Sequence, residues 1–213
     1  MTTAKPREHA MPGLCSVLLV EDDLALSGYL AASLADAGYL VQAVSHRAEA
    51  GLRLALAPQP QLMLLDLGLP PHASGMGEGL ALLDEALRNS PALKVIVLTG
   101  QDEDAAALEA IRRGAFDFLV KPASLASIHG ALDRAKLFTQ TESRMTAVGE
   151  ARLHLTARLW EGPKEAASGA EEQLMRRTLV AAGYNVAEVA RQLGMAREHV
   201  YYYLNKYGLR RPD

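Results

Sequence analysis

The chain lacks most of the features that mark disulfide-bonded, membrane-spanning or secreted proteins. Its single cysteine, Cys15, excludes an internal disulfide and cannot build a zinc site alone. No run reaches the roughly 18 apolar residues that a membrane helix needs. The N-terminal stretch MTTAKPREHAMPG also lacks the apolar core of a signal peptide. These absences predict a cytoplasmic protein with no membrane partner.

The remaining composition is that of a globular protein with one or two domains. The 213 residues are 49% hydrophobic and 22% charged. The charge is uneven, because residues 14–138 carry 15 acidic against 9 basic residues, whereas residues 139–213 carry 9 against 11. An acidic first part and a mildly basic second part predict a cation site in one and an anionic partner for the other.

Residues 15–138 alternate short apolar runs with longer stretches of helical periodicity. The runs are apolar at consecutive positions, which predicts strands buried on both faces. We expect an α/β domain with a doubly wound, five-stranded parallel sheet, whose ligands lie at the carboxyl ends of the strands. The predicted strands are 16–20, 40–44, 61–66, 94–99 and 116–120, and the predicted helices are 24–37, 47–56, 79–90, 103–113 and 124–138.

The rest of the chain divides into three further segments. We predict a flexible N-terminus at residues 1–14 and a linker at residues 139–167, into which the fifth helix could extend. Residues 168–213 predict a small all-α domain with helices near 170–182, 186–193 and 196–207. Ser168 with Glu171 and Asn185 with Glu188 have capping-box spacing, and Gly194 stands where a left-handed residue would end a helix. The short second connection predicts a helix-turn-helix.

Acidic residues follow two of the predicted strands. Glu21, Asp22 and Asp23 follow the first strand, and Asp66 ends the third. Carboxylates that converge at one sheet edge repel each other and attract a hard divalent cation, for which Mg²⁺ is the natural choice. Single acidic residues after strands are often only helix caps, but here several strand ends carry polar groups.

A hydroxyl and an ammonium are predicted at the same edge. Thr99 ends the fourth strand, and Lys121, followed by Pro122, ends the fifth. Beside a metal-bound carboxylate, these groups can neutralise the oxygens of a phosphoryl group. The four strand ends together predict a phosphoryl-accepting pocket.

These motifs resemble the receiver domain of two-component response regulators, a flavodoxin-like fold. The resemblance covers about residues 15–138 through LLVEDD at 18–23, LLDLGLP at 64–70, VLTG at 97–100 and GAFDFLVKP at 114–122. It implies that Asp66 is the phosphoacceptor and that a magnesium site is formed by Glu21, Asp22, Asp66 and the Gly68 carbonyl. It further implies phosphoryl contacts and switching by Thr99, Lys121 and Phe118, and a cis Lys121–Pro122 peptide.

The resemblance implies a switch rather than an enzyme. Asp66 would take a phosphoryl group from a partner sensor histidine kinase or a small phosphodonor and slowly hydrolyse its own acyl phosphate. Phosphorylation is expected to promote a homodimer, through the surface around the fourth and fifth helices or through residues 139–160. A phosphatase-like hydrolase is a weaker alternative, because the pocket has no second general acid.

One departure from the receiver pattern lies beside Asp66. Residues 71–78, PHASGMGE, form a longer loop than receivers usually have, although no pocket residue is lost. His72 in this loop could be a phosphohistidine or a ligand. We favour an ordinary solvated side chain instead, since loop histidines are usually solvated.

Residues 171–208 resemble the Fis-type helix-turn-helix of nitrogen-regulator-like activators. The resemblance depends on GYNVAEVARQLGM at 183–195 and YLNKYGL at 203–209. It implies binding of double-stranded DNA, with the third helix in the major groove. The predicted DNA-binding residues are Arg197, His199, Tyr201, Tyr202, Lys206, Arg210 and Arg211.

The alternative for the C-terminal helices is a module that binds another protein. Tyr202, Tyr203 and Ala196 depart from the family, which usually has basic residues and a Ser or Thr cap there. The chain also has no P-loop and only about 30 residues between the two regions, so we expect no central ATPase. The expected architecture is a receiver joined directly to a Fis-type domain.

Overall fold

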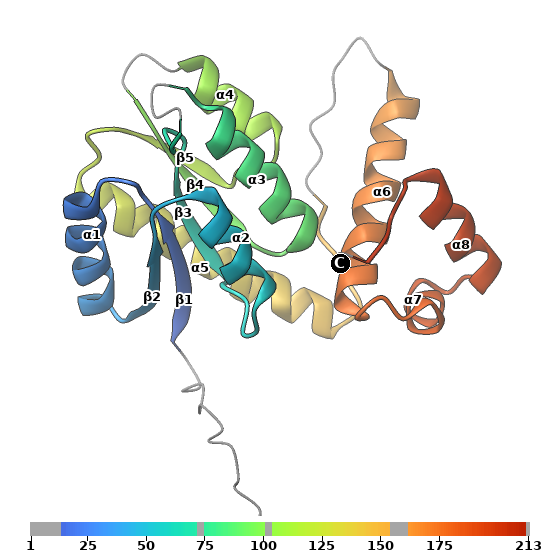
Figure 1. Cartoon of the computed structure of the whole chain (residues 1–213). Coiled ribbons are helices and arrows are strands. Elements are labelled where there is room, and N and C mark those ends of the chain that lie inside the picture. The colour runs from blue at the N-terminus through green and yellow to red at the C-terminus, as the bar shows by residue number, and fades with distance from the viewer. Residues whose placement is uncertain (1–13, 72–74, 101–103, 154–161, 212–213) are drawn as a thin grey trace, which may run out of the picture.

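The computed structural model describes residues 14–71, 75–100, 104–153 and 162–211, and its N-terminal part is a layered α/β unit (Figure 1). All strand pairs are parallel, and the sheet order is β2-β1-β3-β4-β5. The predicted doubly wound parallel sheet is therefore confirmed. Its strands are β1 (Cys15–Val20), β2 (Tyr39–Val44), β3 (Leu62–Asp66), β4 (Lys94–Thr99) and β5 (Asp117–Val120).

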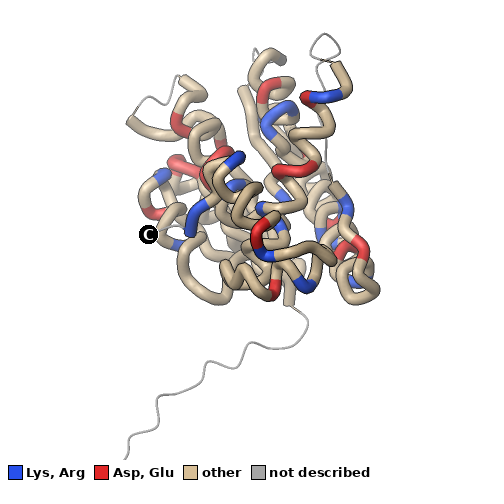
Figure 2. The backbone as a smooth tube through the Cα atoms, turned by 90° about the vertical axis from the view of Figure 1, so that its right-hand side faces the viewer, with Lys and Arg blue, Asp and Glu red and all other residues tan. Residues whose placement is uncertain are grey.

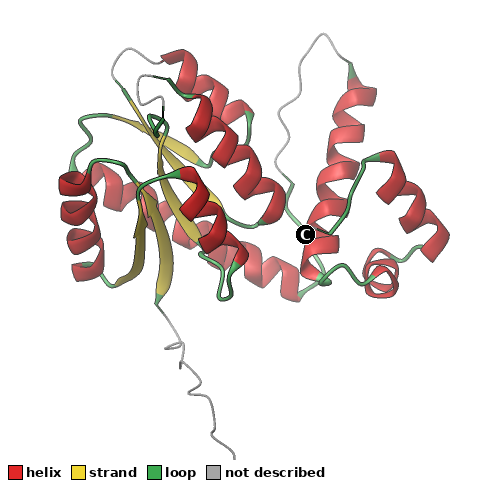
Figure 3. Cartoon of the chain, viewed as in Figure 1, coloured by secondary structure: helices red, strands yellow, loops and turns green. Residues whose placement is uncertain are grey.

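Helices cover both faces of this sheet, as Figure 3 shows. On one face Leu18 and Val20 of β1 pack with α2 (Arg47–Ala55), α3 (Gly77–Asn89) and α4 (Asp104–Arg112). On the other face Val17 and Leu19 pack with α1 (Leu24–Asp36) and α5 (Leu125–Ala147). Because successive strand residues point to opposite faces, a continuous apolar run supplies both layers of core.

The expectation that every strand is buried on both faces is wrong for the two edge strands. Residues of β1, β3 and β4 are almost all buried, whereas β2 and β5 alternate with more exposed positions. Leu40 of β2 is 52% exposed and Val120 of β5 is 41% exposed. The strand order explains the difference, since β2 and β5 lie at the edges and are covered less completely.

The fifth helix extends beyond the sheet. It continues past position 138, where the main helix prediction stopped, and ends at Ala147. This confirms the extension considered for the start of the 139–167 segment. Gly149, with φ of +82°, follows the end of the helix in a conformation that glycine adopts at little cost. Trp160, which the sequence favours as a packing anchor over a site residue, lies outside the described residues.

The C-terminal helices form a separate small core. Met175 and Leu179 of α6 (Pro163–Ala181) pack with Val189 of α7 (Val186–Leu193) and Val200 of α8 (Arg197–Lys206). The predicted cap is confirmed, because Asn185 Oδ1 accepts the amides of Ala187 and Glu188 at 3.0 and 3.2 Å. Gly194 is left-handed as expected, with φ of +63°. Among the described helices, none combines the length and hydropathy of a membrane span.

The predicted start of the first C-terminal helix is wrong. The helix α6 begins at Pro163, not near residue 170, so Ser168 lies inside it and caps nothing. Instead, Ser168 Oγ lies 3.1 Å from the Tyr207 hydroxyl. Gly162 followed by proline at the first helical position is an equally good start signal, because proline lacks only an amide that has no intrahelical partner there.

One glycine is needed where α3 crosses the chain that follows Asp66. A Cβ atom on Gly79 would lie 2.4 Å from the Leu67 Cα atom and 2.6 Å from the Leu67 carbonyl oxygen. Both are backbone atoms, so side-chain rotation cannot relieve the clash. The spacing between α3 and the segment after Asp66 therefore depends on glycine.

Replacing this glycine tests the packing. We expect Gly79→Ala to lower the free energy of unfolding by about 1–3 kcal/mol, as overpacking does, measured by urea denaturation. Gly28→Ala in α1 is the matched control, because its Cβ would meet nothing within 4 Å. The control should be neutral or gain up to about 1 kcal/mol from helix propensity. Equal denaturation midpoints for the two variants would contradict the packing argument.

Candidate functional site

Three carboxylates meet at the carboxyl edge of the sheet. Glu21 and Asp22 directly follow β1, and Asp66 is the last residue of β3, the neighbouring strand. One ligand oxygen of each lies within 4.8 Å of the others, in a group that could hold a metal ion. Glu21 and Asp66 are buried, with 1% and 6% exposure, and Asp22 is half-buried. The expected convergence of these three residues is therefore present.

Lys121 reaches two of these carboxylates from the end of the outer strand β5. It follows β5, and its Nζ lies 2.8 Å from both Glu21 Oε2 and Asp66 Oδ2. The Lys121–Pro122 peptide is cis, as predicted. The ammonium donates charge-assisted hydrogen bonds, which are stronger than neutral ones. It neutralises only part of the charge of three carboxylates, so the edge keeps a capacity for a cation.

The environment of the pocket shifts the pKa values of Glu21 and Lys121. Burial raises the pKa of Glu21, and the negative charge of Asp66 adds to that rise, against the hydrogen bond from Lys121. Burial alone would lower the pKa of Lys121. Its hydrogen bonds to Asp66 and Glu21 together outweigh burial and raise the pKa instead. Lys121 thus stays protonated at neutral pH, and Glu21 is the carboxyl whose ionisation is made costly.

The loop after β3 holds the Asp66 side chain. The Gly68 amide donates to Asp66 Oδ1 at 3.1 Å, and the Leu67 amide donates to the Leu98 carbonyl at 3.2 Å. Gly68 was predicted to contribute its carbonyl to a metal site, and its recorded contact with Asp66 is through the amide. This amide fixes one carboxylate oxygen while Lys121 takes the other. His72, in the same loop, lies outside the described residues.

Thr99 and Phe118 occupy different positions relative to this edge. Thr99 ends β4 beside β3, is 1% exposed, and donates from Oγ1 to the Gly100 carbonyl at 3.4 Å. Phe118 lies on the edge strand β5 and is 39% exposed, like Val120 at 41%. In this conformation the phenyl ring is a surface group.

Asp23, the third acidic residue after β1, has a different role. Its Oδ1 accepts the amides of Ala25 and Leu26 at 2.9 and 3.1 Å, which makes it the N-cap of α1. Two adjacent carboxylates thus have separate functions, because the chain turns between them. Asp23 provides a natural control for substitutions of the pocket.

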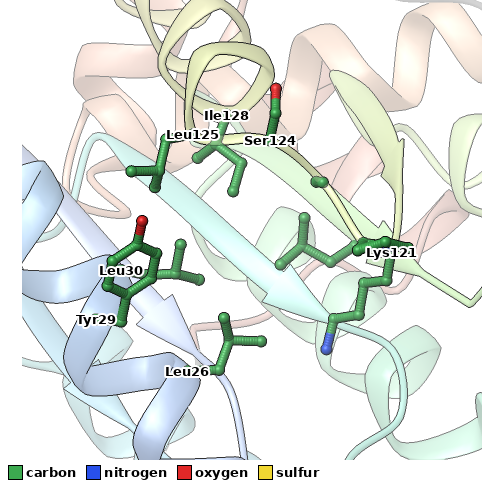
Figure 4. Close-up of a pocket in the computed structure, with 10 residues that line it drawn as sticks. Leu26, Tyr29, Leu30, Lys121, Ser124, Leu125 and Ile128 are labelled. Atoms are coloured by element: carbon green, nitrogen blue, oxygen red, sulfur yellow. The ribbon is translucent and has the colours of Figure 1, made fainter.

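Sequence reasoning missed an apolar hollow beside the pocket. A cavity of about 630 Å³ lies between α1 and the start of α5, with Lys121 at its edge (Figure 4). Its lining includes Leu26, Tyr29, Pro122 and Leu125. Tyr29 is 58% exposed although it belongs to an apolar helix. The helical periodicity of residues 24–37 did not distinguish this rim from ordinary core.

The C-terminal helices expose most of the residues predicted to contact DNA. Arg197, His199, Tyr201 and Tyr202 are exposed on α8, whereas Val200 of the same helix is buried in the core. Arg210 and Arg211 are exposed just beyond the helix. Tyr201 and Tyr202 are 55% and 59% exposed, so two of the three consecutive tyrosines face solvent.

Lys206, also predicted as a phosphate contact, is exposed and pairs with another helix of the C-terminal part. Its Nζ lies 2.8 Å from Glu171 Oε2 of α6 and 4.7 Å from the centre of the Tyr207 ring. The hydrogen bond to Glu171 raises the pKa of Lys206, and the same bond lowers the pKa of Glu171. This ammonium therefore joins α6 to α8 and is not a free positive charge. The spacing of 35 residues concealed the pair from sequence inspection.

The charges of these helices are mixed. Figure 2, in which the C-terminal helices face the viewer, shows acidic and basic positions interspersed along them. Arg191 pairs with Glu188, and Arg176 pairs with Glu172 at 2.7 Å. The mildly basic composition thus does not form one continuous basic face.

The raised pKa of Glu21 makes a prediction for stability. The ordinary pKa of a glutamate is 4.5. As pH rises above 4.5, Glu21 therefore keeps more of its proton in the folded state than in the unfolded state. The ionised form of buried Glu21 costs folding free energy. This cost is present above the folded-state pKa of Glu21 and disappears as pH falls toward 4.5. We expect Glu21→Gln to flatten the pH dependence of unfolding between pH 4.5 and neutrality, measured by urea denaturation in EDTA. Glu198→Gln, on exposed α8, is the control, and an unchanged slope in Glu21→Gln would refute the assignment.

Comparison with protein families identifies both parts of the chain. Residues 17–133 match the response regulator receiver domain, and residues 169–207 match the Fis family of bacterial regulatory proteins. The second match spans α7, α8 and most of α6, the helices that form the small C-terminal core.

Individual relatives match about half of the chain. The nitrogen assimilation regulatory protein NtrX of Azorhizobium caulinodans is 36% identical over 106 residues, which are 50% of this chain and 22% of that protein. The acid tolerance regulatory protein ActR of Sinorhizobium medicae is 34% identical over 117 residues, which are 55% of this chain and 57% of that protein. The chain spans about a quarter or less of the first curated relatives it matches.

Solved structures agree with this similarity. The receiver domain of NtrX from Brucella abortus is 31% identical, with a TM-score of 0.51, over 56% of this chain and 96% of that one. The receiver model itself matches more than half of the residues, and its range contains the carboxylates, Thr99 and Lys121. The chain therefore belongs to the response regulator receiver family.

Proposed function

We propose that this protein is a two-component response regulator that accepts a phosphoryl group on Asp66 and controls transcription by binding DNA. The observation that carries the proposal is the meeting of Glu21, Asp22 and Asp66 around the Lys121 ammonium. A buried carboxylate flanked by acidic metal ligands and one cation fits an acceptor of phosphoryl groups. Few other chemistries need this combination.

The donor set fits Mg²⁺. Glu21, Asp22 and Asp66 offer carboxylate oxygens, and hard oxygen ligands are those that this ion takes. The Gly68 carbonyl is proposed as a further ligand. Bound there, Mg²⁺ would supply charge that neutralises phosphoryl oxygens. Lys121 would hold a further oxygen, and the hydroxyl of Thr99 another. These ligand and contact roles belong to the proposal.

The proposed reaction is transfer between a phosphohistidine and Asp66. A carboxylate oxygen of Asp66 forms a bond to phosphorus as the phosphorus–nitrogen bond of the donor breaks, and the imidazole keeps the electron pair. The donor would be a sensor histidine kinase in the cytoplasm. Its approach is supported by the apolar hollow between α1 and α5, which adjoins Lys121 and exposes Tyr29. Slow hydrolysis of the acyl phosphate would reset the switch.

Phosphorylation is proposed to promote a homodimer. Leu108 and Ile111 of α4 are 51% and 36% exposed, and they share the α4–β5 surface with exposed Phe118 and Val120. Exposed apolar side chains gathered on one face favour association. This observation favours the α4–β5 surface over residues 139–160. Movement of Phe118 on phosphorylation would change the same surface.

The proposed output is direct binding to double-stranded DNA by α8. The domains proposed are the receiver at 15–138 and the Fis-type unit at 168–213, with no ATPase between them. Only residues 148–162 separate α5 from α6, too few for such a domain. Arg197 and the exposed tyrosines would contact DNA, and Lys206 would exchange its hydrogen bond with Glu171 for a phosphate contact. The exposed tyrosines equally suit a protein partner, which is the second candidate.

The first test concerns the acceptor. Incubation with acetyl phosphate and Mg²⁺ should add one phosphoryl group to the parent protein, seen by intact-protein mass spectrometry, and none to Asp66→Asn. Asp23→Asn is the matched control, because Asp23 caps α1 and asparagine keeps an acceptor there. A stable label on Asp66→Asn, or its loss from Asp23→Asn alone, would show that the acceptor lies elsewhere.

The second test concerns DNA. Gel-shift titration of the phosphorylated protein with genomic fragments should give a specific complex. Arg197→Ala should weaken it and, if the contact is to phosphate, reduce the slope of log affinity against log salt by about one. Arg53→Ala, exposed on α2, should change neither. Absence of any specific shift at physiological salt would favour the protein-binding alternative.

A further inference from the structure

A buried ion cluster joins the two parts of the chain. Glu142, on the part of α5 that extends beyond the sheet, has its Oε2 2.6 Å from Lys94 Nζ at the start of β4. The same oxygen lies 3.5 Å from an Arg177 nitrogen on α6. The side chains of Lys94, Glu142 and Arg177 are 6%, 5% and 17% exposed. One carboxylate thus pairs with one cation from each part of the chain.

A second contact holds the same arginine. Arg177 Nη1 donates to the Arg152 carbonyl at 2.7 Å, and the Arg152 guanidinium lies 4.7 Å from the centre of the Phe138 ring. Phe138 in turn packs edge to face with Phe116, at 5.1 Å between ring centres. Arg177 is therefore held from two directions, by a buried carboxylate and by a chain segment packed on α5.

A cavity lies beside this cluster, so the contact between the two parts is incompletely filled there. This cavity, of about 410 Å³, lies between the start of β4, α5 and α6. Its lining includes Gln59, Ser90, Thr139 and Ser143 opposite Val180 and Ala181 of α6. Since the cavity separates these surfaces, the charge cluster is a direct contact between the two parts beside it. Removing one member of a buried ion cluster leaves the others uncompensated, which is strongly unfavourable.

The face of α8 that is proposed to contact DNA stays open in this arrangement. Tyr201 and Tyr202 keep 55% and 59% exposure with the whole chain present. In Figure 1, α6 lies between the receiver and α8. The hydrogen bond from Lys206 to Glu171 at 2.8 Å ties α8 to α6, so the orientation of α8 follows that of α6.

We propose that Glu142, Lys94 and Arg177 form an interdomain joint, which fixes the orientation of the C-terminal helices on the receiver without covering the exposed face of α8. The receiver would then position the recognition helix and not mask it. That consequence for DNA rests on the proposed function, whereas the joint itself does not. In a dimer, the geometry of the receiver pair would set the spacing of the two α8 helices, to which half-site spacing must correspond.

The joint lies at the opposite end of β4 from the acceptor pocket. Lys94 begins this strand and Thr99 ends it, roughly 16 Å apart at the usual rise per residue. Substitutions at Arg177 should therefore leave the uptake of phosphate from acetyl phosphate unchanged. This separates failure of the joint from failure of the phosphoacceptor proposal.

The joint can be tested by distance measurement between spin labels. Labels at Leu52→Cys on α2 and Glu198→Cys on α8, both exposed, report the orientation of the two parts, while Cys15 is buried at 4% exposure. Pulsed electron–electron double resonance on the doubly labelled full chain should give one narrow distribution of distances between the labels. Arg177→Ala should lose that single narrow maximum. Arg176→Ala is the matched control, because Arg176 neighbours Arg177 but pairs with Glu172 on its own helix.

Each outcome decides the proposal. A narrow distribution in the parent and Arg176→Ala, lost in Arg177→Ala, supports the joint. A narrow distribution that persists in Arg177→Ala overturns it, as does a broad distribution in the parent. Helical circular dichroism and acetyl phosphate uptake establish that each variant is folded. If Arg177→Ala fails that check, Glu142→Gln replaces it, and the distribution of the parent still decides whether the joint forms.

Discussion

The site depends on one shared ammonium between two buried carboxylates. Lys121 comes from β5 and bridges Glu21 of the β1 end to Asp66 of the β3 end, so one ion links three of the five strand ends. Burial makes the charge of Glu21 costly, and Lys121 offsets only part of that cost. A divalent cation or a phosphoryl group would each change this balance. A pocket with unbalanced charge is sensitive to its occupant, which is the property that a switch needs.

The sheet and the pocket were predictable because they depend on local patterns. Buried strands of a parallel sheet are continuously apolar, and polar residues at their carboxyl ends stand out against that background. Glu21, Asp66 and Lys121 could be placed together once the strands were taken as neighbours. The exposure of β2 and β5 could not be read in the same way. Their residues resemble those of inner strands, and only the strand order identifies them as edges.

The contacts that the sequence did not reveal join residues far apart in it. The pairs Lys206–Glu171 and Lys94–Glu142 are separated by 35 and 48 residues, and neither fits a helical or strand spacing. A lysine after an apolar helix face reads equally well as a phosphate contact or as half of an ion pair. The prediction that Ser168 caps a helix was wrong because the capping-box spacing occurs inside a helix that begins at Pro163. Local motifs indicate what a residue can do, and tertiary contacts determine which option is used.

The two ion clusters lie at opposite ends of the sheet, and one helix connects them. The proposed acceptor pocket is at the carboxyl edge of the sheet, and the cluster around Glu142 is near its opposite edge. The helix α5 connects them, since it starts beside Lys121 and carries Glu142 in its extension. A change of receiver pairing at the α4–β5 surface would move both α5 helices as rigid rods. With α6 held on α5 through Arg177, the proposed recognition helices would follow this movement.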